Sequence, residues 1–264
     1  MLKTICFDLD DTLLWDKKSI QTAFEETCKT VEGVSSEALE AAVREEATAL
    51  YQSYPIYPHT QMIGINPFEG LWGSFDDPGE AFQQMKAIIP TYQTEAWTRG
   101  LRKVGIDDAA LGATLAQRFI ENRINNPFTY EETYAVLDQL KDTYQLVLLT
   151  NGASSLQRLK LDITPEIAER FDHIIISGEF GRGKPDVSIF EHLIDVAGVS
   201  KEEAIMIGDN LNTDILGSNR LGMKNIWINH HNQTAEAVKP TYTVTRLQEI
   251  LPIIEMLSNS SSTH

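Results

Sequence analysis

Residues 4 to 14 read Thr-Ile-Cys-Phe-Asp-Leu-Asp-Asp-Thr-Leu-Leu, and the pair Asp8 and Asp10 within them is the most informative feature of the chain. The apolar run from Leu2 to Phe7 is typical of a buried parallel strand, whose carboxyl end reaches the crevice where open α/β sheets hold ligands. Asp8 and Asp10 follow at positions i and i+2, so their side chains point the same way while the chain stays extended. The sequence therefore predicts an acidic site at the end of an N-terminal strand.

The pair Asp8 and Asp10 places two like charges close together, which is costly unless a cation or a shared proton relieves them. A hard divalent ion is the simplest answer, because Mg²⁺ is usually bound by one or two carboxylates together with substrate phosphate and waters. The alternative is an acidic strand end that only caps a turn. One Asp-x-Asp motif does not decide between the two.

Three further motifs, each after or near a predicted strand, favour the metal site. They are Leu148-Leu149-Thr150-Asn151-Gly152, then Gly183-Lys184-Pro185-Asp186 at the start of a helix, then Gly208-Asp209 followed by Asp214 after the strand Ala204 to Ile207. Together with Asp-Leu-Asp-Asp-Thr, they stand in the order of the four motifs of the haloacid dehalogenase (HAD) superfamily, which the chain resembles. The resemblance covers essentially the whole predicted core and, more loosely, the topology of an inserted cap.

The resemblance implies a catalytic role for the residues of the first and fourth motifs. Asp8 matches the nucleophile that attacks phosphorus to give an aspartyl-phosphate. Asp10 matches the general acid/base, which protonates the leaving alcohol and then activates water. Asp8, the backbone carbonyl of Asp10 and the carboxylate of Asp209 match the ligands of Mg²⁺.

The second and third motifs match the groups that hold phosphate. Thr150 and the backbone N–H of Asn151 are expected to bind phosphate oxygens. Lys184 is expected to balance the charge on Asp8 and on the phosphate during an in-line displacement.

Other polar residues near the motifs are given supporting or surface positions. Asp214 is expected to support the metal or the motif-three lysine without direct ligation. Thr12 is expected to bond back to the turn after the strand, and a structural role is favoured for Asp11. His230 and His231 follow the last strand without a third ligand at suitable spacing, so we expect them in a surface loop.

Length, composition and charge fit a globular enzyme of one or two domains. The 264 residues are 42% hydrophobic and 23% charged, and the net charge of −16 argues against nucleic acid as a partner, since such binding needs a basic footprint.

No stretch approaches the ~20 apolar residues of a membrane span, and Met1 leads directly into the first strand, so we expect a cytoplasmic protein without a membrane partner. Cys6 and Cys28 lack metal-type spacing and are expected to be reduced thiols.

The arrangement of the predicted elements gives the fold class and the domains. Strands alternating with helices predict an α/β fold, a Rossmann-like parallel sheet with right-handed crossovers. The resemblance makes the helical region between the first two strands an all-helical cap, so the predicted domains are 1–15 and 127–264 for the catalytic core and 16–126 for the cap. Strands are predicted at 2–7, 145–150, 173–177, 204–207 and 225–228; helices are predicted at 19–31, 36–51, 80–89, 95–104, 107–123, after Asp186 as N-cap, and near 246–257, before a frayed tail at 258–264.

The stretch from Tyr51 to Gly79 is rich in Pro, Gly and aromatic residues and contains no clear periodicity. Loops this long are uncommon in compact domains and often functional. One interpretation is a structural loop whose aromatic side chains pack on the cap helices. The other is that its tip, Asn66 to Gly70, reaches over the site and helps to select the substrate.

Taken together, the residues and the resemblance predict a Mg²⁺-dependent phosphomonoester hydrolase that acts on a small phosphorylated metabolite through an aspartyl-phosphate. Phosphoserine is the leading candidate substrate, and the oligomeric state is open. A phosphomutase of the same superfamily and a non-catalytic protein that binds phosphorylated metabolites are the alternatives, and the complete catalytic set favours an enzyme. Asp10 argues against a true haloalkanoate dehalogenase, because those members act without metal and lack the second aspartate.

Overall fold

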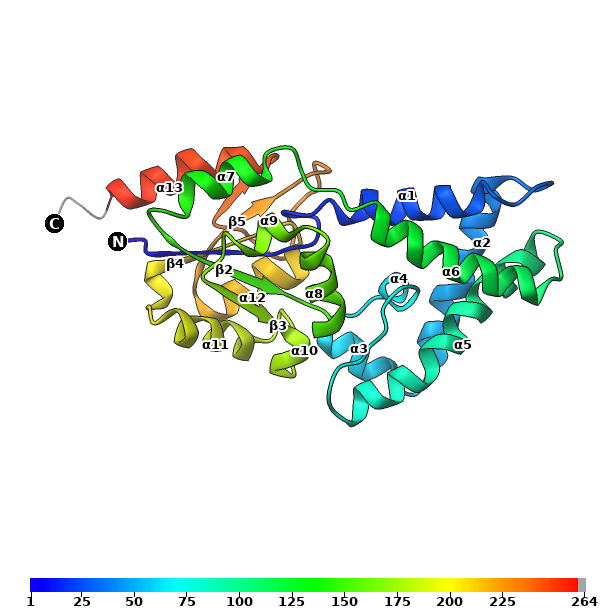
Figure 1. Ribbon diagram of the computed structural model, residues 1–264. Helices are drawn as coiled ribbons and strands as arrows, with labels where there is room; N and C mark the ends of the chain where they lie inside the picture. Colours follow the sequence, from blue (N-terminus) through cyan, green and yellow to red (C-terminus); the bar gives the residue numbers. More distant parts are fainter. Residues whose placement is uncertain (261–264) are drawn as a thin grey trace. The chain divides into compact units, whose positions relative to one another are not determined.

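The computed structural model describes residues 1–260, which form two compact units (Figure 1). The core unit comprises residues 1–15, 129–152 and 164 onward, and the helical unit comprises residues 16–128 and 153–163. Among the described residues, no helix is long and apolar enough to cross a membrane.

The core unit is built on a six-stranded sheet in which every pair of neighbours is parallel. Its order, β3-β2-β1-β4-β5-β6, reverses direction between β1 and β4, the place where open α/β sheets hold their ligands. The α/β fold class predicted from the motifs and strand pattern is thus confirmed. The strands are β1 (Thr4–Phe7), β2 (Gln145–Thr150), β3 (His173–Ile176), β4 (Ala204–Gly208), β5 (Lys224–Ile228) and β6 (Tyr242–Val244).

Helices cover both faces of this sheet, with α11 on one side and α7 and α13 on the other (Figure 1). Alternate residues of the strands, among them Cys6, Val147 and Met206, pack with Phe190 of α11 in one apolar cluster. The helices of the core unit are α7 (Thr133–Leu140), α9 (Pro165–Ala168), α10 (Ser177–Phe180), α11 (Val187–Ala197), α12 (Leu216–Leu221) and α13 (Ile250–Asn259), with 3₁₀ turns at Lys201–Glu203 and Leu247–Glu249 and a π-helical turn at Leu211–Ile215.

The ends of the core helices refine the sequence predictions. Asp186 is the N-cap of α11, as predicted, and its side chain accepts a hydrogen bond from the Ser188 amide at 2.9 Å. The last helix, α13, begins at Ile250 rather than near 246 and continues to Asn259. The predicted frayed tail therefore starts too early, and its residues 261–264 lie outside the described part of the chain.

The helical unit contains no strand within the described residues. Three aromatic residues, Phe24, Trp97 and Phe119, form its centre, with ring centroids 4.6–5.9 Å apart. Gly100 lets α2 and α5 pack closely, because a Cβ there would lie 2.4 Å from Val43 Cγ2. The helices are α1 (Asp16–Cys28), α2 (Ser36–Ser53), α3 (Tyr57–Ile63), α4 (Pro67–Gly70), α5 (Glu80–Lys103), α6 (Ala109–Asn125) and α8 (Ser154–Asp162).

One helix prediction for this unit is wrong in detail. The helices predicted at 80–89 and 95–104 are one helix, α5, with Pro90 inside it. A proline in a helix interior is costly, but buried Ile89 and Tyr92 on either side of it keep the packed face continuous. The predicted domain boundaries remain a prediction; the compact units differ from them chiefly because α8, placed in the core by the sequence, groups with the helical unit.

The predicted long loop from Tyr51 to Gly79 contains two short helices, α3 and α4. The supposed tip is a capped helical turn: the Asn66 side chain accepts from the amides of Phe68 and Glu69, each at 2.9 Å, and Glu69 accepts from the Asn66 amide at 3.0 Å. This is a capping box, which the sequence Asn-Pro-Phe-Glu encodes locally. The aromatic residues Tyr51, Trp72 and Phe75 are buried, as the structural interpretation expects.

Candidate active site

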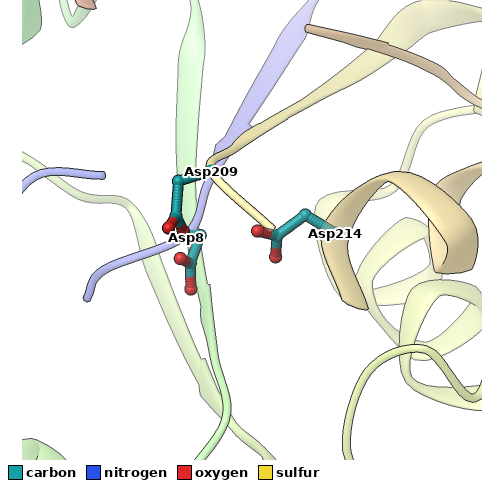
Figure 2. A group of neighbouring side chains, drawn as sticks. All are labelled: Asp8, Asp209 and Asp214. Atoms are coloured by element: carbon teal, nitrogen blue, oxygen red, sulfur yellow. The ribbon is translucent and has the colours of Figure 1, made fainter. Parts of the chain in front are cut away.

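The residues of the four motifs gather within the core unit, at the carboxyl ends of its central strands. Asp8 follows β1, Thr150 ends β2, and Asp209 follows β4, while Lys184 lies in the turn that precedes α11. The Asp8 amide donates to the Ile207 carbonyl at 2.9 Å, which fixes the end of β1 against β4. Figure 2 shows Asp8 and Asp209 side by side, with Asp214 turned toward them from the neighbouring turn.

Lys184 forms the centre of the buried hydrogen-bond network. Its Nζ donates to Asp8 Oδ1 at 2.8 Å, to Asp214 Oδ1 at 2.7 Å and to the Leu149 carbonyl at 2.8 Å. An ammonium group has three donors, so these contacts satisfy it completely. With only 5% of its surface exposed, Lys184 holds two carboxylates from separate motifs in a fixed geometry.

The buried charges shift the pKa of both members of the central pair. Burial, followed by the negative charge of Asp214, raises the pKa of Asp8 to about 7, although Lys184 opposes the rise. Burial alone would favour the neutral form of Lys184, but the carboxylates of Asp214 and Asp8 outweigh it and raise the Lys184 pKa above its usual range. The site therefore carries an excess of buried negative charge, which a bound cation would relieve.

Three carboxylates can present oxygen atoms to one metal ion. Asp8, Asp209 and Asp214 each offer an oxygen, and the three oxygens lie within 4.8 Å of one another. Both oxygens of fully buried Asp214 already accept hydrogen bonds, one from Lys184 and one from the Asn210 amide at 3.1 Å. All-oxygen donors suit Mg²⁺, and the two carboxylates of Asp8 and Asp209 fit its usual protein ligands better than a third from Asp214 would.

The side chain of Asp214 leaves no room for a side chain at Gly208. A Cβ at this position would lie 2.2 Å from Asp214 Oδ2, so glycine is required for the carboxylate to reach Lys184. Asp214 itself lies in the π-helical turn Leu211–Ile215, a geometry frequent at functional sites. The sequence singled out Gly208 as part of a motif but gave no steric reason for it.

Asn151 joins the second motif to the third. Its side chain donates to the Lys184 carbonyl at 2.9 Å and accepts from the Lys184 amide at 2.8 Å. Next to it, the Gly152 amide donates to the hydroxyl of Ser177 at 2.8 Å. Ser177 was missed by the sequence reasoning, although its place directly after β3, at the same edge of the sheet, is a signal that could have identified it.

Thr12, which the sequence predicts to bond back to the turn after the strand, also contacts the side chain of Asp8. Its hydroxyl donates to Asp8 Oδ2 at 3.2 Å, while Lys184 donates to Oδ1. The carboxylate is therefore held by two donors from different parts of the chain. Such restraint orients an attacking oxygen before substrate arrives.

His230 has a defined position and is not simply part of a surface loop. Its Nε2 lies 2.7 Å from the carbonyl oxygen of Asp11, which only accepts, so this nitrogen carries the proton in that contact. The ring stacks on Tyr130 with centroids 4.8 Å apart. Asp11 has a left-handed backbone with φ of 59°, so its carbonyl is held in an unusual direction. The structural role favoured for Asp11 fits the contact between its carbonyl and His230. His231 is exposed, as expected of a residue in a surface loop.

The core unit thus combines a parallel, doubly wound sheet with an acidic cluster and a buried lysine at its switch point. A profile of the haloacid dehalogenase-like hydrolases matches residues 2–222. The chain is 32% identical to the phosphoserine phosphatase of Thermus thermophilus over 86% of its own length and 88% of the relative. It belongs to the HAD-like hydrolases, and within that family it is a phosphatase.

Other relatives differ in the substrate that their names give. The N-acylneuraminate-9-phosphatase of Mus musculus is 30% identical over 67% of this chain and 73% of the relative. The pyrimidine 5'-nucleotidase PynA of Streptococcus pneumoniae is 28% identical over 96% of this chain and 95% of the relative. Among solved structures, the HAD-hydrolase YfnB of Bacillus subtilis, bound to magnesium, matches with a TM-score of 0.67 and 20% identity over 96% of this chain and 98% of that one. At this identity the structural match shows the fold alone.

Proposed function

We propose that this phosphatase hydrolyses small phosphomonoesters through an aspartyl-phosphate on Asp8. The observation that carries the proposal is the network around Lys184, which holds Asp8 and Asp214 at the carboxyl ends of the central strands. The Asp8 side chain is buried, and its carboxylate accepts hydrogen bonds from Thr12 and Lys184. Such restraint is expected of an oriented nucleophile. The comparisons support the reaction class and leave the substrate open.

The donor set around Asp8 supports a Mg²⁺ site. Asp8 and Asp209 would hold the ion with the backbone carbonyl of Asp10, and Asp214 would act through Lys184 instead of ligating it. Bound there, Mg²⁺ would neutralise negative charge on the phosphate and on the acidic cluster.

The proposed reaction has two displacements at phosphorus. In the first, an Asp8 carboxylate oxygen forms a bond to phosphorus while the ester P–O bond breaks, and Asp10 gives a proton to the leaving alkoxide. In the second, Asp10 takes a proton from water, whose oxygen bonds to phosphorus while the bond to Asp8 breaks. We propose that Lys184 stabilises the charge on the equatorial oxygens in both steps, together with Thr150 and the backbone N–H of Asn151.

Two variants separate proton transfer from metal binding. Asp10→Asn is expected to keep Mg²⁺ affinity, because the backbone carbonyl survives, and to lower kcat on a metabolite by ~10²–10⁴-fold. Asp209→Ala is expected to weaken Mg²⁺ binding and to recover part of its activity at high metal concentration. Activity measured against Mg²⁺ concentration checks both. The same metal dependence in the two variants would contradict this division of roles.

The raised pKa of Asp8 predicts that Mg²⁺ binding weakens in mild acid. In the metal-free protein Asp8 has a pKa of about 7, so below that pH a proton competes with the cation for the carboxylate. The affinity should then fall by up to about tenfold for each pH unit below 7. Calorimetric titrations with Mg²⁺ from pH 5.5 to 8.5 test this. An affinity that stays constant over the range would show that Asp8 is ionised throughout, or is not a ligand.

Phosphoserine is the substrate that we propose first, since a relative with 32% identity over most of both chains is named for it. Nucleoside monophosphates and sugar phosphates are the competing classes, because other relatives carry such names. A panel of phosphorylated metabolites, compared by kcat/KM with Mg²⁺ present, tests the assignment. A clear preference for a nucleotide or a sugar-acid phosphate over phosphoserine would overturn it.

A further inference from the structure

The turn that follows β1 has a fixed backbone at Asp10 and Asp11. The amide of Asp11 donates to the Leu14 carbonyl at 2.7 Å. The peptide bond between Asp10 and Asp11 is trans, so its C=O points to the opposite side from its N–H. The contact with Leu14 therefore directs the Asp10 carbonyl, which we propose as a ligand of Mg²⁺, away from Leu14.

Asp11 has a backbone conformation that needs support from its surroundings. Its φ of 59° lies in the left-handed region, which tolerates Asp better than most residues but is less favourable than the right-handed region for any L-amino acid. A change of φ at Asp11 would rotate the Asp10–Asp11 peptide and turn the Asp10 carbonyl with it. The direction of that carbonyl thus depends on the contacts that hold Asp11 in the left-handed state.

His230 supplies such a contact from another part of the core unit. Its Nε2 donates to the Asp11 carbonyl at 2.7 Å. The residue before it, Asn229, is fixed at the end of β5, because its amide donates to the Val244 carbonyl at 2.7 Å and its side chain forms two hydrogen bonds with the Gln233 backbone, each 2.9 Å long. The imidazole is therefore presented to Asp11 from an ordered strand end.

The imidazole ring is also held in place by a stack of aromatic rings. His230 stacks on Tyr130 with centroids 4.8 Å apart, and Tyr130 stacks on Trp15 at 5.3 Å, with 15° between the planes in both pairs. The Tyr130 amide donates to the Leu13 carbonyl at 3.2 Å. The contacts thus run from Asp11 through His230 and Tyr130 back to the same turn, and all of these residues belong to the core unit.

From this arrangement we infer that His230 is a positioning residue for the Asp10 carbonyl and, through it, for the Mg²⁺ site. Its hydrogen bond to the Asp11 carbonyl stabilises the left-handed conformation, and that conformation sets the direction of the Asp10–Asp11 peptide. His230 acts through the backbone of Asp11 and is assigned no contact with metal or phosphate. This assignment rests on the proposed function, because it takes the Asp10 carbonyl as a metal ligand.

Two substitutions separate the hydrogen bond of His230 from its aromatic stack. His230→Phe keeps a planar ring on Tyr130 but has no donor for the Asp11 carbonyl. His230→Gln loses the ring, yet its amide nitrogen is as many bonds from Cα as the imidazole Nε2 and can donate. His231→Phe is the matched control, since this neighbouring imidazole is exposed. The measured quantities are the Mg²⁺ dissociation constant by calorimetry in mildly alkaline buffer, kcat with para-nitrophenyl phosphate at saturating Mg²⁺, and the midpoint of thermal unfolding.

His230→Phe is expected to raise the Mg²⁺ dissociation constant by about fivefold, because loss of one hydrogen bond lowers the fraction of molecules whose carbonyl is correctly directed. The change in kcat at saturating Mg²⁺ should be smaller, since excess metal selects the competent conformation. His230→Gln should recover most of the affinity, and His231→Phe should leave it unchanged.

Two results would overturn the inference. A His230→Phe protein with a lower unfolding midpoint but wild-type Mg²⁺ affinity would show that His230 only stabilises the fold. Equal losses of affinity in His230→Phe and His230→Gln would show that the hydrogen bond to Asp11 is not the contact that matters.

A measurement without metal separates this inference from the proposed function. In the metal-free protein, the Asp11 amide should exchange its hydrogen faster in His230→Phe than in the wild type, because the turn opens more often when Asp11 loses a contact. An unchanged exchange rate would contradict the positioning role whether or not the protein binds Mg²⁺. A wild-type protein that neither binds Mg²⁺ nor hydrolyses phosphomonoesters would instead defeat the proposed function.

Discussion

Asp8→Asn is expected to lower kcat for every phosphomonoester by at least about 10³-fold while the protein stays folded. The amide is nearly isosteric with the carboxylate but does not attack phosphorus, and it contributes no charge to a metal site. It also removes one of the two carboxylates held by Lys184. Steady-state rates with para-nitrophenyl phosphate and with phosphoserine, at saturating Mg²⁺, provide the measurement.

The control for this variant is its unfolding transition. Asp8 has a raised pKa because burial disfavours its charge, so replacing it by a neutral amide should not destabilise the metal-free protein severely. Loss of activity with a retained cooperative transition therefore identifies a chemical defect. Retention of more than a few per cent of wild-type kcat by purified Asp8→Asn protein would remove the covalent mechanism from consideration.

Lys184→Met is expected to have the largest effect on stability. It leaves the carboxylates of Asp8 and Asp214 buried without their cation, and breaking a buried charge pair in this way typically costs about 3–5 kcal/mol. The same change should lower kcat by at least about 10²-fold, because the positive charge next to Asp8 and the proposed transition state is lost. Denaturant unfolding and steady-state kinetics on one preparation measure both effects.

A double-mutant cycle shows whether the destabilisation comes from the unpaired charge. Adding Asp214→Asn to Lys184→Met removes one of the stranded carboxylates, so the double variant should be more stable than Lys184→Met alone. In the wild-type background, Asp214→Asn should instead destabilise, since it weakens the contact to Lys184. Additive effects of the two changes would contradict the network as described.

The sequence was most informative where chemistry and strand position coincide. Asp8, Thr150 and Asp209 each follow or end an apolar run, and parallel strands bring their carboxyl ends to one edge, so the clustering of these residues was predictable. Lys184 could be added from the resemblance, because its motif stands in the expected order. The hydrogen bonds that fix these side chains were not predictable in the same way.

Most of the structural features that could not be predicted from the sequence depend on contacts between residues far apart in the chain. The Leu149 carbonyl and the Ser177 hydroxyl carry no signal of their own, and their roles depend on how the chain returns to the sheet edge. Pro90 would ordinarily end a helix, but α5 stays helical through this position because the residues on both sides of Pro90 are held by tertiary packing. Helix α4 was missed for the opposite reason, since its capping box is local and readable but lies in a segment dominated by Pro and Gly.

The most direct test of the covalent route uses pre-steady-state kinetics of Asp10→Asn with para-nitrophenyl phosphate and Mg²⁺. Nitrophenolate leaves without a proton from Asp10, so transfer of the phosphoryl group to Asp8 should remain fast, whereas the water that cleaves the intermediate has lost its base. We expect a burst of about one nitrophenolate per active site, followed by a slow steady rate. Release that is linear from the first turnover, in a variant that still hydrolyses the ester slowly, would contradict an aspartyl-phosphate intermediate on Asp8.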